Sequence, residues 1–358
     1  MSHQGQLPVV HVETAAVPDL PGGRLSRWRP VALALGLAVA VALPWLVYPP
    51  LATDILAWGL FAISVDLLLG YGGLLSFGHA AFWGASAYTA GLIALNTGLP
   101  FPVAVLGGAV VSMVIALPTG WLAVRRSGIY FAMVTLAYAQ MLFFLANQAR
   151  SLTGGENGLQ GIPKSFFGLS AVESDPFMFY FASLPILLLG IWWARRTVRS
   201  PFGRVLMALR DNPDRARSLG YDVEKYKLRA FVISAGLAGL AGGVFAISHG
   251  FASLQDLSWS TSGEAVLVAV LGGIGTLWGG LLGAGVVVLL EDWLASSGFD
   301  GLGIVMGTIF IVIVLLFRRG LWGSVAEGVR RLIQKRARRR VEPLVEPPRV
   351  LVDDESRV

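Results

Sequence analysis

The chain has 358 residues, of which 55% are hydrophobic and only 14% are charged, and its mean hydropathy is +0.66. This composition excludes an ordinary soluble domain, which must cover itself with polar side chains. The formal net charge is +6, but the basic residues stand in short polar segments between apolar runs, a placement that argues against nucleic-acid binding. The absence of cysteine excludes disulfides, thiolate metal sites and cysteine nucleophiles.

The first 29 residues are polar and end in a basic cluster directly before an apolar run. We expect residues 1–29 to form a cytoplasmic tail. A cleaved signal peptide is disfavoured, because the basic cluster lies far from the start and the following run is long enough to stay embedded. A second cytoplasmic tail is expected at 318–358, whose basic part contains nine Lys and Arg residues between Arg318 and Arg340.

Apolar runs that can cross a hydrocarbon core of about 30 Å recur from Pro30 to Phe317. We therefore predict an all-α polytopic membrane protein whose transmembrane domain occupies residues 30–317. About ten transmembrane elements are expected, at 31–48, 52–70, 74–95, 103–124, 129–148, 177–194, 229–249, 262–272, 277–295 and 303–317. This even number places both termini in the cytoplasm together with the arginine-rich loop 195–228, as the positive-inside rule requires.

The element at 262–272 is expected to be a half-helix, because about ten residues of helix span only about 15 Å. It stops at Gly272 and Gly273, within the sequence LGGIGT. Backbone groups freed at membrane depth are tolerated only where they face protein or a water-filled cavity, so we expect a permeation pathway nearby. The alternative is a glycine-rich turn between two helices with no transport role.

Few titratable groups are available in the apolar segments to build a catalytic centre, and no metal-ligand spacing such as HExxH occurs. None of the four lysines stands in a GxxxxGK[ST] phosphate-binding loop, so any coupling to ATP must come from another subunit. We predict that the chain is not an enzyme and has no cofactor or metal.

Asp66 is the most conspicuous ionisable residue in apolar surroundings, where burying a charge costs at least about 2.5 to 3.5 kcal/mol. It is interpreted either as a polar element of the pathway or proton carrier, or as a carboxyl hydrogen-bonded between helices. For His79, a substrate contact and an interhelical hydrogen bond are both open. Glu264 has a simpler interpretation, because the sequence TSGE from Thr261 matches a capping box at the start of the half-helix.

The arginine-rich loop is predicted to contain a short polar helix. Asp211 or Asn212 can cap it, Pro213 suits its first position, and Gly220 can end it. The helix is too polar to span the membrane. It is expected to dock on another protein at the inner face, although membrane lipid headgroups are an alternative partner.

Four motifs occur in order between Gly70 and Ala284: GYGGLLSFGHAAF, LTGGENGLQGIP, ALRDNPDRARSLGYDVEKYKLRAF and VLGGIGTLWGGLLGA. Together they resemble the permease subunits of branched-chain amino acid ABC importers, and most of all the LivM kind. The resemblance implies a permease of the bacterial inner membrane. Its implied partners are a LivH-like permease subunit, two cytoplasmic ATP-binding subunits and a periplasmic substrate-binding protein.

The resemblance also implies roles for particular residues. The segment from Asp211 to Gly220 corresponds to a coupling helix that inserts into an ATPase subunit. The coupling residues are then Asp211, Asn212, Asp214, Arg215, Ala216, Leu219 and Gly220. The implied translocation region contains Ser76, Gly78, His79, Phe82, Gly272, Gly273 and Gly275, to which Asp66 is added as the ionisable candidate.

The sequence departs from the family's pattern at Asp66, where Asn is frequent, and at Leu74, where Gln is frequent. These departures leave the substrate open between branched-chain or related amino acids and the urea, short amides or other small carboxylates that the same family transports. An ion-coupled secondary transporter, motivated by Asp66 and the broken helix, is a second hypothesis. An intramembrane enzyme, motivated only by His79 with Ser76, is a third.

Overall fold

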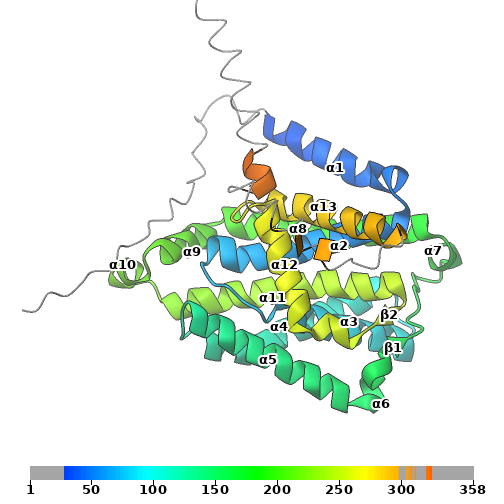
Figure 1. Ribbon diagram of the computed structural model, residues 1–358, viewed down its shortest axis with the longest axis horizontal. Helices are drawn as coiled ribbons and strands as arrows, with labels where there is room; N and C mark the ends of the chain where they lie inside the picture. Colours follow the sequence, from blue (N-terminus) through cyan, green and yellow to red (C-terminus); the bar gives the residue numbers. More distant parts are fainter. Residues whose placement is uncertain (1–27, 298–303, 306, 309–310, 312–319, 325–358) are drawn as a thin grey trace, which may run out of the picture.

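The computed structural model describes residues 28–297, 304–305, 307–308, 311 and 320–324. The described part is a bundle of long helices joined by short helices and one small ladder (Figure 1). The α-helices are α1 (Trp28–Leu46), α2 (Pro49–Asp66), α3 (His79–Thr97), α4 (Phe101–Ala123), α5 (Ile129–Gln148), α6 (Arg150–Thr153), α7 (Ser170–Ser174), α8 (Pro176–Arg199), α9 (Pro201–Asp211), α10 (Pro213–Ser218), α11 (Val223–His249), α12 (Trp259–Gly272) and α13 (Leu277–Ser296). The remaining elements are the π-helical turn η2 (Leu67–Tyr71), the 3₁₀ turns η3 (Gly155–Asn157) and η4 (Leu254–Leu257), and the strands β1 (Leu159–Gln160) and β2 (Phe251–Ala252).

Six of the described helices are long and apolar enough to cross a membrane, which confirms the predicted all-α polytopic membrane architecture. They are α2 with η2, α4, α5, α8, α11 and α13. Helices α1, α3 and α12 also lie at expected spans, but they do not meet the same length and apolarity over their described residues. The tenth element, 303–317, lies largely outside the described residues, so the count of ten remains a prediction.

Helices α2 and α11 form the centre of the bundle. In their most apolar 18-residue stretches, 89% and 83% of the residues are buried, compared with 22% in α5. Small residues in α11 let its neighbours approach closely: a Cβ at Gly242 would lie 2.3 Å from the Trp83 carbonyl oxygen of α3. Helix α11 is therefore the scaffold against which α2, α3 and α4 pack.

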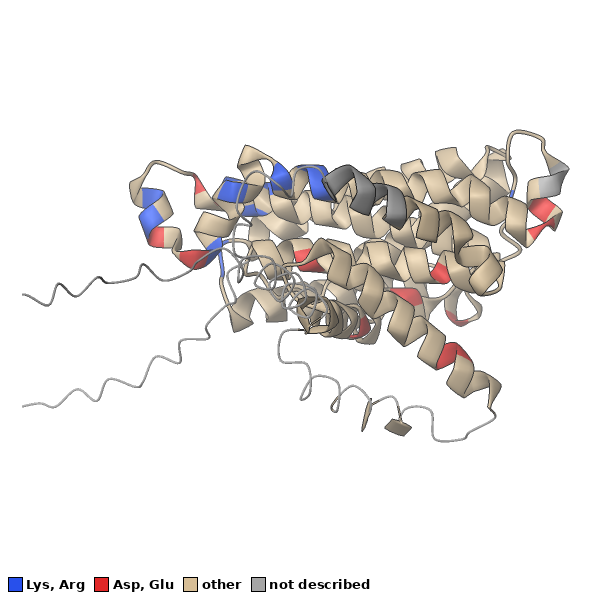
Figure 2. Cartoon of the chain, turned by 90° about the horizontal axis from the view of Figure 1, so that it is seen from above, with Lys and Arg blue, Asp and Glu red and all other residues tan. Residues whose placement is uncertain are grey.

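The arginine-rich segment from the end of α8 to the start of α11 lies at one end of the bundle, which we call the α10 end. Helix α4 ends there, since Gly120 contacts Leu228 near the start of α11, and α2 ends there, since Arg210 of α9 contacts Gly70. In Figure 2, Lys and Arg gather towards this end, whereas the long helices between the two ends carry few charges. Such one-sided clustering is the pattern that the positive-inside rule describes.

The opposite end of the bundle is closed by the glycine-rich segment that begins after α5. Its strand β1 pairs antiparallel with β2, with Leu159 opposite Ala252. Gly158 has a φ of +65°, and a Cβ there would lie 2.4 Å from the Ala252 carbonyl oxygen, so both its backbone conformation and its surroundings require glycine. This ladder fixes the long loop against the end of α11.

The half-helix α12 begins at Trp259, three residues earlier than predicted, and its 14 residues span roughly 21 Å. The predicted capping box at Thr261 is wrong, because Ser258 is the N-cap and accepts a hydrogen bond from the Ser260 backbone N–H. The Thr261 hydroxyl instead donates to a backbone carbonyl of η4. Since the helix starts earlier than expected, Glu264 lies in its second turn, too far along to reach the N-cap backbone.

Candidate functional site

The start of α3 lies inside the bundle, and neighbouring helices supply its hydrogen bonds. The Ser262 hydroxyl of α12 accepts from the Ala80 backbone N–H at 2.8 Å, and the Thr135 hydroxyl of α5 accepts from the Phe77 N–H at 3.2 Å. The first backbone N–H groups of a helix have no partner within the helix, and they must find one at membrane depth. We call this region the α3 joint: Ser76, Gly78, His79, Thr135, Ser234 and Ser262.

His79 connects three helices within the α3 joint. Its fully buried ring places Nε2 2.7 Å from the Ser234 hydroxyl of α11, and that hydroxyl donates to the Ser64 carbonyl of α2 at 2.5 Å. Because the Ser234 proton goes to Ser64, the Ser234 oxygen accepts from His79 Nε2–H. The interhelical hydrogen bond is thus the alternative that the structure shows for His79.

The other residues predicted from the first motif are also buried. A Cβ at Gly78 would lie 2.9 Å from the Thr135 carbonyl oxygen, so α5 approaches where only glycine fits. The Phe82 ring packs edge-on against Phe231 of α11, with 5.4 Å between the ring centroids. Ser76 is 1% exposed and accepts a hydrogen bond from the Gly78 N–H. The structure thus brings these residues together in one packed joint, and their contact with a transported molecule remains a prediction.

The second predicted region is the break between α12 and α13, at residues 273–276. Gly273 and Gly275 have φ values of +117° and +78°, in the region that favours glycine. A Cβ at Gly272 would lie 1.9 Å from the Gly279 carbonyl oxygen, so the two helices meet without side chains between them. The predicted glycine break is confirmed. Gly272 is required by the close approach of α13, and Gly273 and Gly275 are required by their positive φ values.

Asp66, at the end of α2, lies directly against this break. Its Oδ1 accepts from the Gly275 backbone N–H at 2.7 Å, and the Tyr71 hydroxyl donates to the Gly275 carbonyl at 2.8 Å. A Cβ at Gly70 would lie 2.3 Å from Asp66 Oδ1 and 2.5 Å from the Gly275 nitrogen. Asp66 is only 1% exposed, and its carboxylate joins the end of α2 to the break between α12 and α13, in agreement with the predicted alternative of a hydrogen-bonded carboxyl.

The short polar helix predicted in the arginine-rich loop is confirmed as α10. Asn212 is its N-cap and accepts from the Arg215 backbone N–H at 2.9 Å, Pro213 occupies the first position, and Gly220 follows the helix with a φ of +86°. The preceding helix α9 starts in the same way, with Ser200 as its cap and a proline after it. Local sequence therefore determines both helices.

Most of α10 projects away from the bundle. Ala216 alone packs inward, against Leu209 and Val223, while Leu219 is 71% exposed. The other predicted coupling residues are exposed. They are Asp211 at the end of α9, and Asn212, Asp214, Arg215 and Gly220 in and beside α10. The helix thus presents one large apolar side chain among charged groups.

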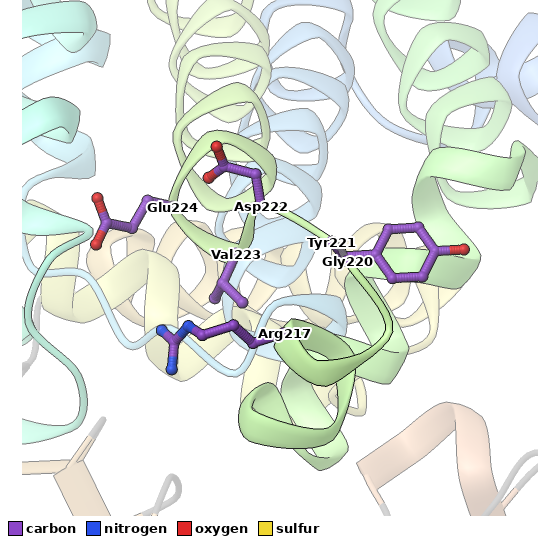
Figure 3. A pocket seen from close by; sticks show the side chains of 6 residues that line it. All are labelled: Arg217, Gly220, Tyr221, Asp222, Val223 and Glu224. Atoms are coloured by element: carbon purple, nitrogen blue, oxygen red, sulfur yellow. The ribbon is translucent and has the colours of Figure 1, made fainter.

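A shallow groove of about 310 Å³ runs beside α10 and the start of α11. Figure 3 shows the Arg217 guanidinium extending to the side where Glu224 lies, and the Tyr221 ring extending to the other side. Asp222, also in the groove, caps α11, and hydrogen bonds from the Lys225 side chain and backbone lower the pKa of its carboxyl. The groove lies directly beside the end of α10, since Arg217 and Gly220 line it.

Sequence reasoning did not assign functional roles to several residues that hold these two regions together. Ser64, Ser234 and Ser262 carry no sequence signal, because hydroxyl residues are frequent in membrane helices. Tyr71 and Arg210 stand within the recognised motifs, but only the folded chain places them against Gly275 and Gly70.

Other titratable side chains lie outside these two regions. His249 pairs with Asp54 at 3.0 Å, and Glu264 and Glu291 are exposed on the neighbouring helices α12 and α13. Within the described ranges, no three His, Cys, Asp or Glu side chains gather into a group that could hold a metal ion.

The described residues thus form a multi-pass helical bundle with a braced helix break and a polar helix held outside it. The family model "Branched-chain amino acid transport system / permease component" matches residues 47–317. The chain belongs to this family of transport permease components.

The chain is similar to the high-affinity branched-chain amino acid transport system permease protein LivM of Escherichia coli, with 30% identity over 79% of this chain and 72% of the relative. The LivM protein of Salmonella typhimurium is 29% identical over the same shares. The autoinducer 2 import system permease protein LsrC of an Enterobacter strain is 34% identical over 54% of this chain and 55% of the relative. No solved structure matches the chain.

Proposed function

We propose that the chain is one permease subunit of an ATP-driven importer that carries branched-chain or related amino acids across the bacterial inner membrane. The observation that carries this proposal is α10, a capped helix held outside the apolar bundle in a chain that has no phosphate-binding loop of its own. A permease of this kind must receive the energy of ATP hydrolysis through a contact, and α10 is a preformed contact.

The proposed partners follow from this division of labour. Two cytoplasmic ATP-binding subunits supply hydrolysis, a LivH-like permease subunit completes the membrane part, and a periplasmic binding protein delivers the substrate. The basic α10 end is then the cytoplasmic side, with both termini there. The names of the LivM relatives support branched-chain amino acids as the substrate, whereas the LsrC relatives support a wider range within the family.

In the proposed mechanism, ATP-driven closure of the two ATPases displaces α10, and the permease pair switches between facing outward and facing inward. Leu219, 71% exposed at the end of α10, is suited to a cleft of an ATPase subunit, and Arg215 is suited to an acidic rim. The glycine break between α12 and α13 is the place where helices can reorient, because its backbone is not tied into a continuous helix.

The test is reconstitution of the complex, co-purified from native membrane, into proteoliposomes loaded with ATP. We expect ATP-dependent uptake of labelled leucine in the presence of the binding protein, and weaker uptake of urea or a short amide. Uptake that persists without the ATPases and is abolished by a protonophore or by Asp66→Asn would instead establish an ion-coupled transporter.

Two variants test the coupling role of α10. Arg215→Glu reverses an exposed charge, and Ala216→Pro removes the backbone N–H that donates to the Asn212 carbonyl. Both should abolish ATP-dependent uptake while leaving the amount of permease in the membrane unchanged. Arg204→Glu, an exposed charge reversal on α9, is the matched control and should retain uptake; normal uptake in both α10 variants contradicts the coupling role.

A further inference from the structure

We propose that Arg210 is a positioning residue that transmits displacement of α10 to the glycine break between α12 and α13. The inference rests on the proposed function and deepens it, because it names the route from the ATPase contact to the membrane helices. The route runs from α10 through the end of α9 to η2 and from there to Gly275.

The first contact joins α9 to η2. Arg210 is the last but one residue of α9, and its half-buried guanidinium donates a hydrogen bond to the Gly70 carbonyl. A Cβ at Gly73 would lie 2.9 Å from Arg210 Cγ, so the loop after η2 lies against the aliphatic part of the same side chain. Figure 1 shows α9 beside the η2 end of α2.

The second contact joins η2 to the break. Asp66, directly before η2, and Tyr71, its last residue, hold the backbone N–H and C=O of Gly275, at 2.7 Å and 2.8 Å. Because Gly70 lacks a Cβ, its backbone lies directly between Arg210 and Gly275. A shift of Arg210 therefore moves the Gly70 backbone, which precedes Tyr71 and lies against both Asp66 and Gly275.

The link from α10 to Arg210 is short and stiff. Only Asn212 separates α9 from α10, and Pro213 restricts the backbone after it. Ala216 of α10 packs against Leu209, the residue before Arg210. Movement of α10 thus displaces the end of α9 as one body, and Asp66 braces the break through its bond to Gly275.

The experiment compares Arg210→Gln with Arg204→Gln in the complete importer complex in proteoliposomes. Arg204 lies on the same helix and is exposed, so it controls for loss of a positive charge. We expect Arg210→Gln to lower the number of molecules imported per ATP hydrolysed by about tenfold, within the range for loss of a coupling contact. ATPase activity and complex assembly should stay near wild type, and Arg210→Lys should recover part of the ratio.

A second readout follows the break itself. The chain has no cysteine, so Ile274→Cys gives this chain a single site for a spin label in the break, where Ile274 is 45% exposed, and the label is attached before assembly with the partner subunits. In the otherwise wild-type complex the label should change its mobility when a non-hydrolysable ATP analogue binds. Arg210→Gln should abolish that change in mobility. Arg204→Gln, which also removes a positive charge, should keep it.

The inference is overturned if Arg210→Gln keeps both the import ratio and the ATP-dependent change at Ile274. If Arg210→Gln fails to assemble, Tyr71→Phe is the second variant, because it removes only the hydroxyl bond to Gly275. A label response to the ATP analogue that equals that of wild type in Tyr71→Phe overturns the inference as well. Failure of the proposed function looks different, because the wild-type complex would then show no ATP-dependent import at all.

Discussion

Helices α3 and α10 both begin with backbone N–H groups that have no partner within the helix, but α3 begins inside the bundle and α10 begins at its exposed end. Helix α10 is capped by Asn212, the residue directly before it, at the exposed end of the molecule. Helix α3 has no side-chain cap of its own, and its Ala80 N–H is bound by Ser262, which is 182 residues away. Where water competes for the backbone a local cap suffices, whereas at membrane depth the partner comes from another helix.

This difference has an energetic consequence. An exposed helix end that loses its cap can hydrogen-bond to water, so the loss is small and local. A buried donor or acceptor that loses its partner keeps the full desolvation penalty, about 1 to 3 kcal/mol. Changes in the α3 joint should therefore affect the stability of the whole bundle, and changes in α10 should affect coupling and leave stability nearly unchanged.

The largest effect is expected from Gly242→Ala, next to the α3 joint. The new Cβ would lie 2.3 Å from the Trp83 carbonyl oxygen, and forcing α3 and α11 apart should destabilise the protein by about 1 to 3 kcal/mol. Intrinsic tryptophan fluorescence on heating in detergent measures the fall in apparent Tm. Gly263→Ala on α12, where no atom of another element lies within 4 Å of the new Cβ, is the control and should not lower the apparent Tm, because alanine favours a helix over glycine.

Ser234→Ala should have the next largest effect. It removes the partner of His79 Nε2 and the donor to the Ser64 carbonyl, leaving buried polar groups unpaired at a cost of about 1 to 3 kcal/mol. The same thermal unfolding experiment should give a lower apparent Tm. Ser218→Ala, at the exposed end of α10, provides the comparison; equal shifts in the two variants would contradict the distinction between the regions.

Asn212→Ala should weaken α10 itself. Loss of the cap costs about 1 kcal/mol, and about a fivefold shift in the helix equilibrium follows. ATP-dependent uptake should fall several-fold with no change in apparent Tm, because α10 adds little to the buried bundle. Asn212→Asp keeps a capping oxygen and should restore uptake; a lowered Tm in Asn212→Ala would show that α10 supports the bundle after all.

The smallest effect is expected from Asp214→Asn. It weakens the 3.0 Å ion pair with Arg217, whose side chains are 88% and 62% exposed, and such surface pairs contribute at most about 1 kcal/mol. Neither apparent Tm nor its dependence on salt should change measurably. A clear loss of stability would mean that this surface is more ordered than its exposure indicates.

The sequence predicted those parts of the site whose hydrogen bonds are local. The motif Asp211 to Gly220 contains the cap, the first-position proline and the final glycine of α10, so its structure followed from neighbouring residues. The glycine break was equally readable, because Gly273 and Gly275 interrupt an apolar run. The same local reasoning failed at Thr261, since the turn η4 ahead of α12 moved the helix start to Trp259.

Composition and periodic apolar runs alone determined that this is a multi-pass helical membrane protein, because every apolar stretch must satisfy its backbone within a helix in lipid. Only the tertiary structure decided that His79 binds Ser234 and that Asp66 binds Gly275. Those contacts join residues 155 and 209 positions apart, and the chemistry of a hydroxyl or a carboxylate does not specify which distant partner it meets. The packing of α2, α3, α11 and α12 makes that choice.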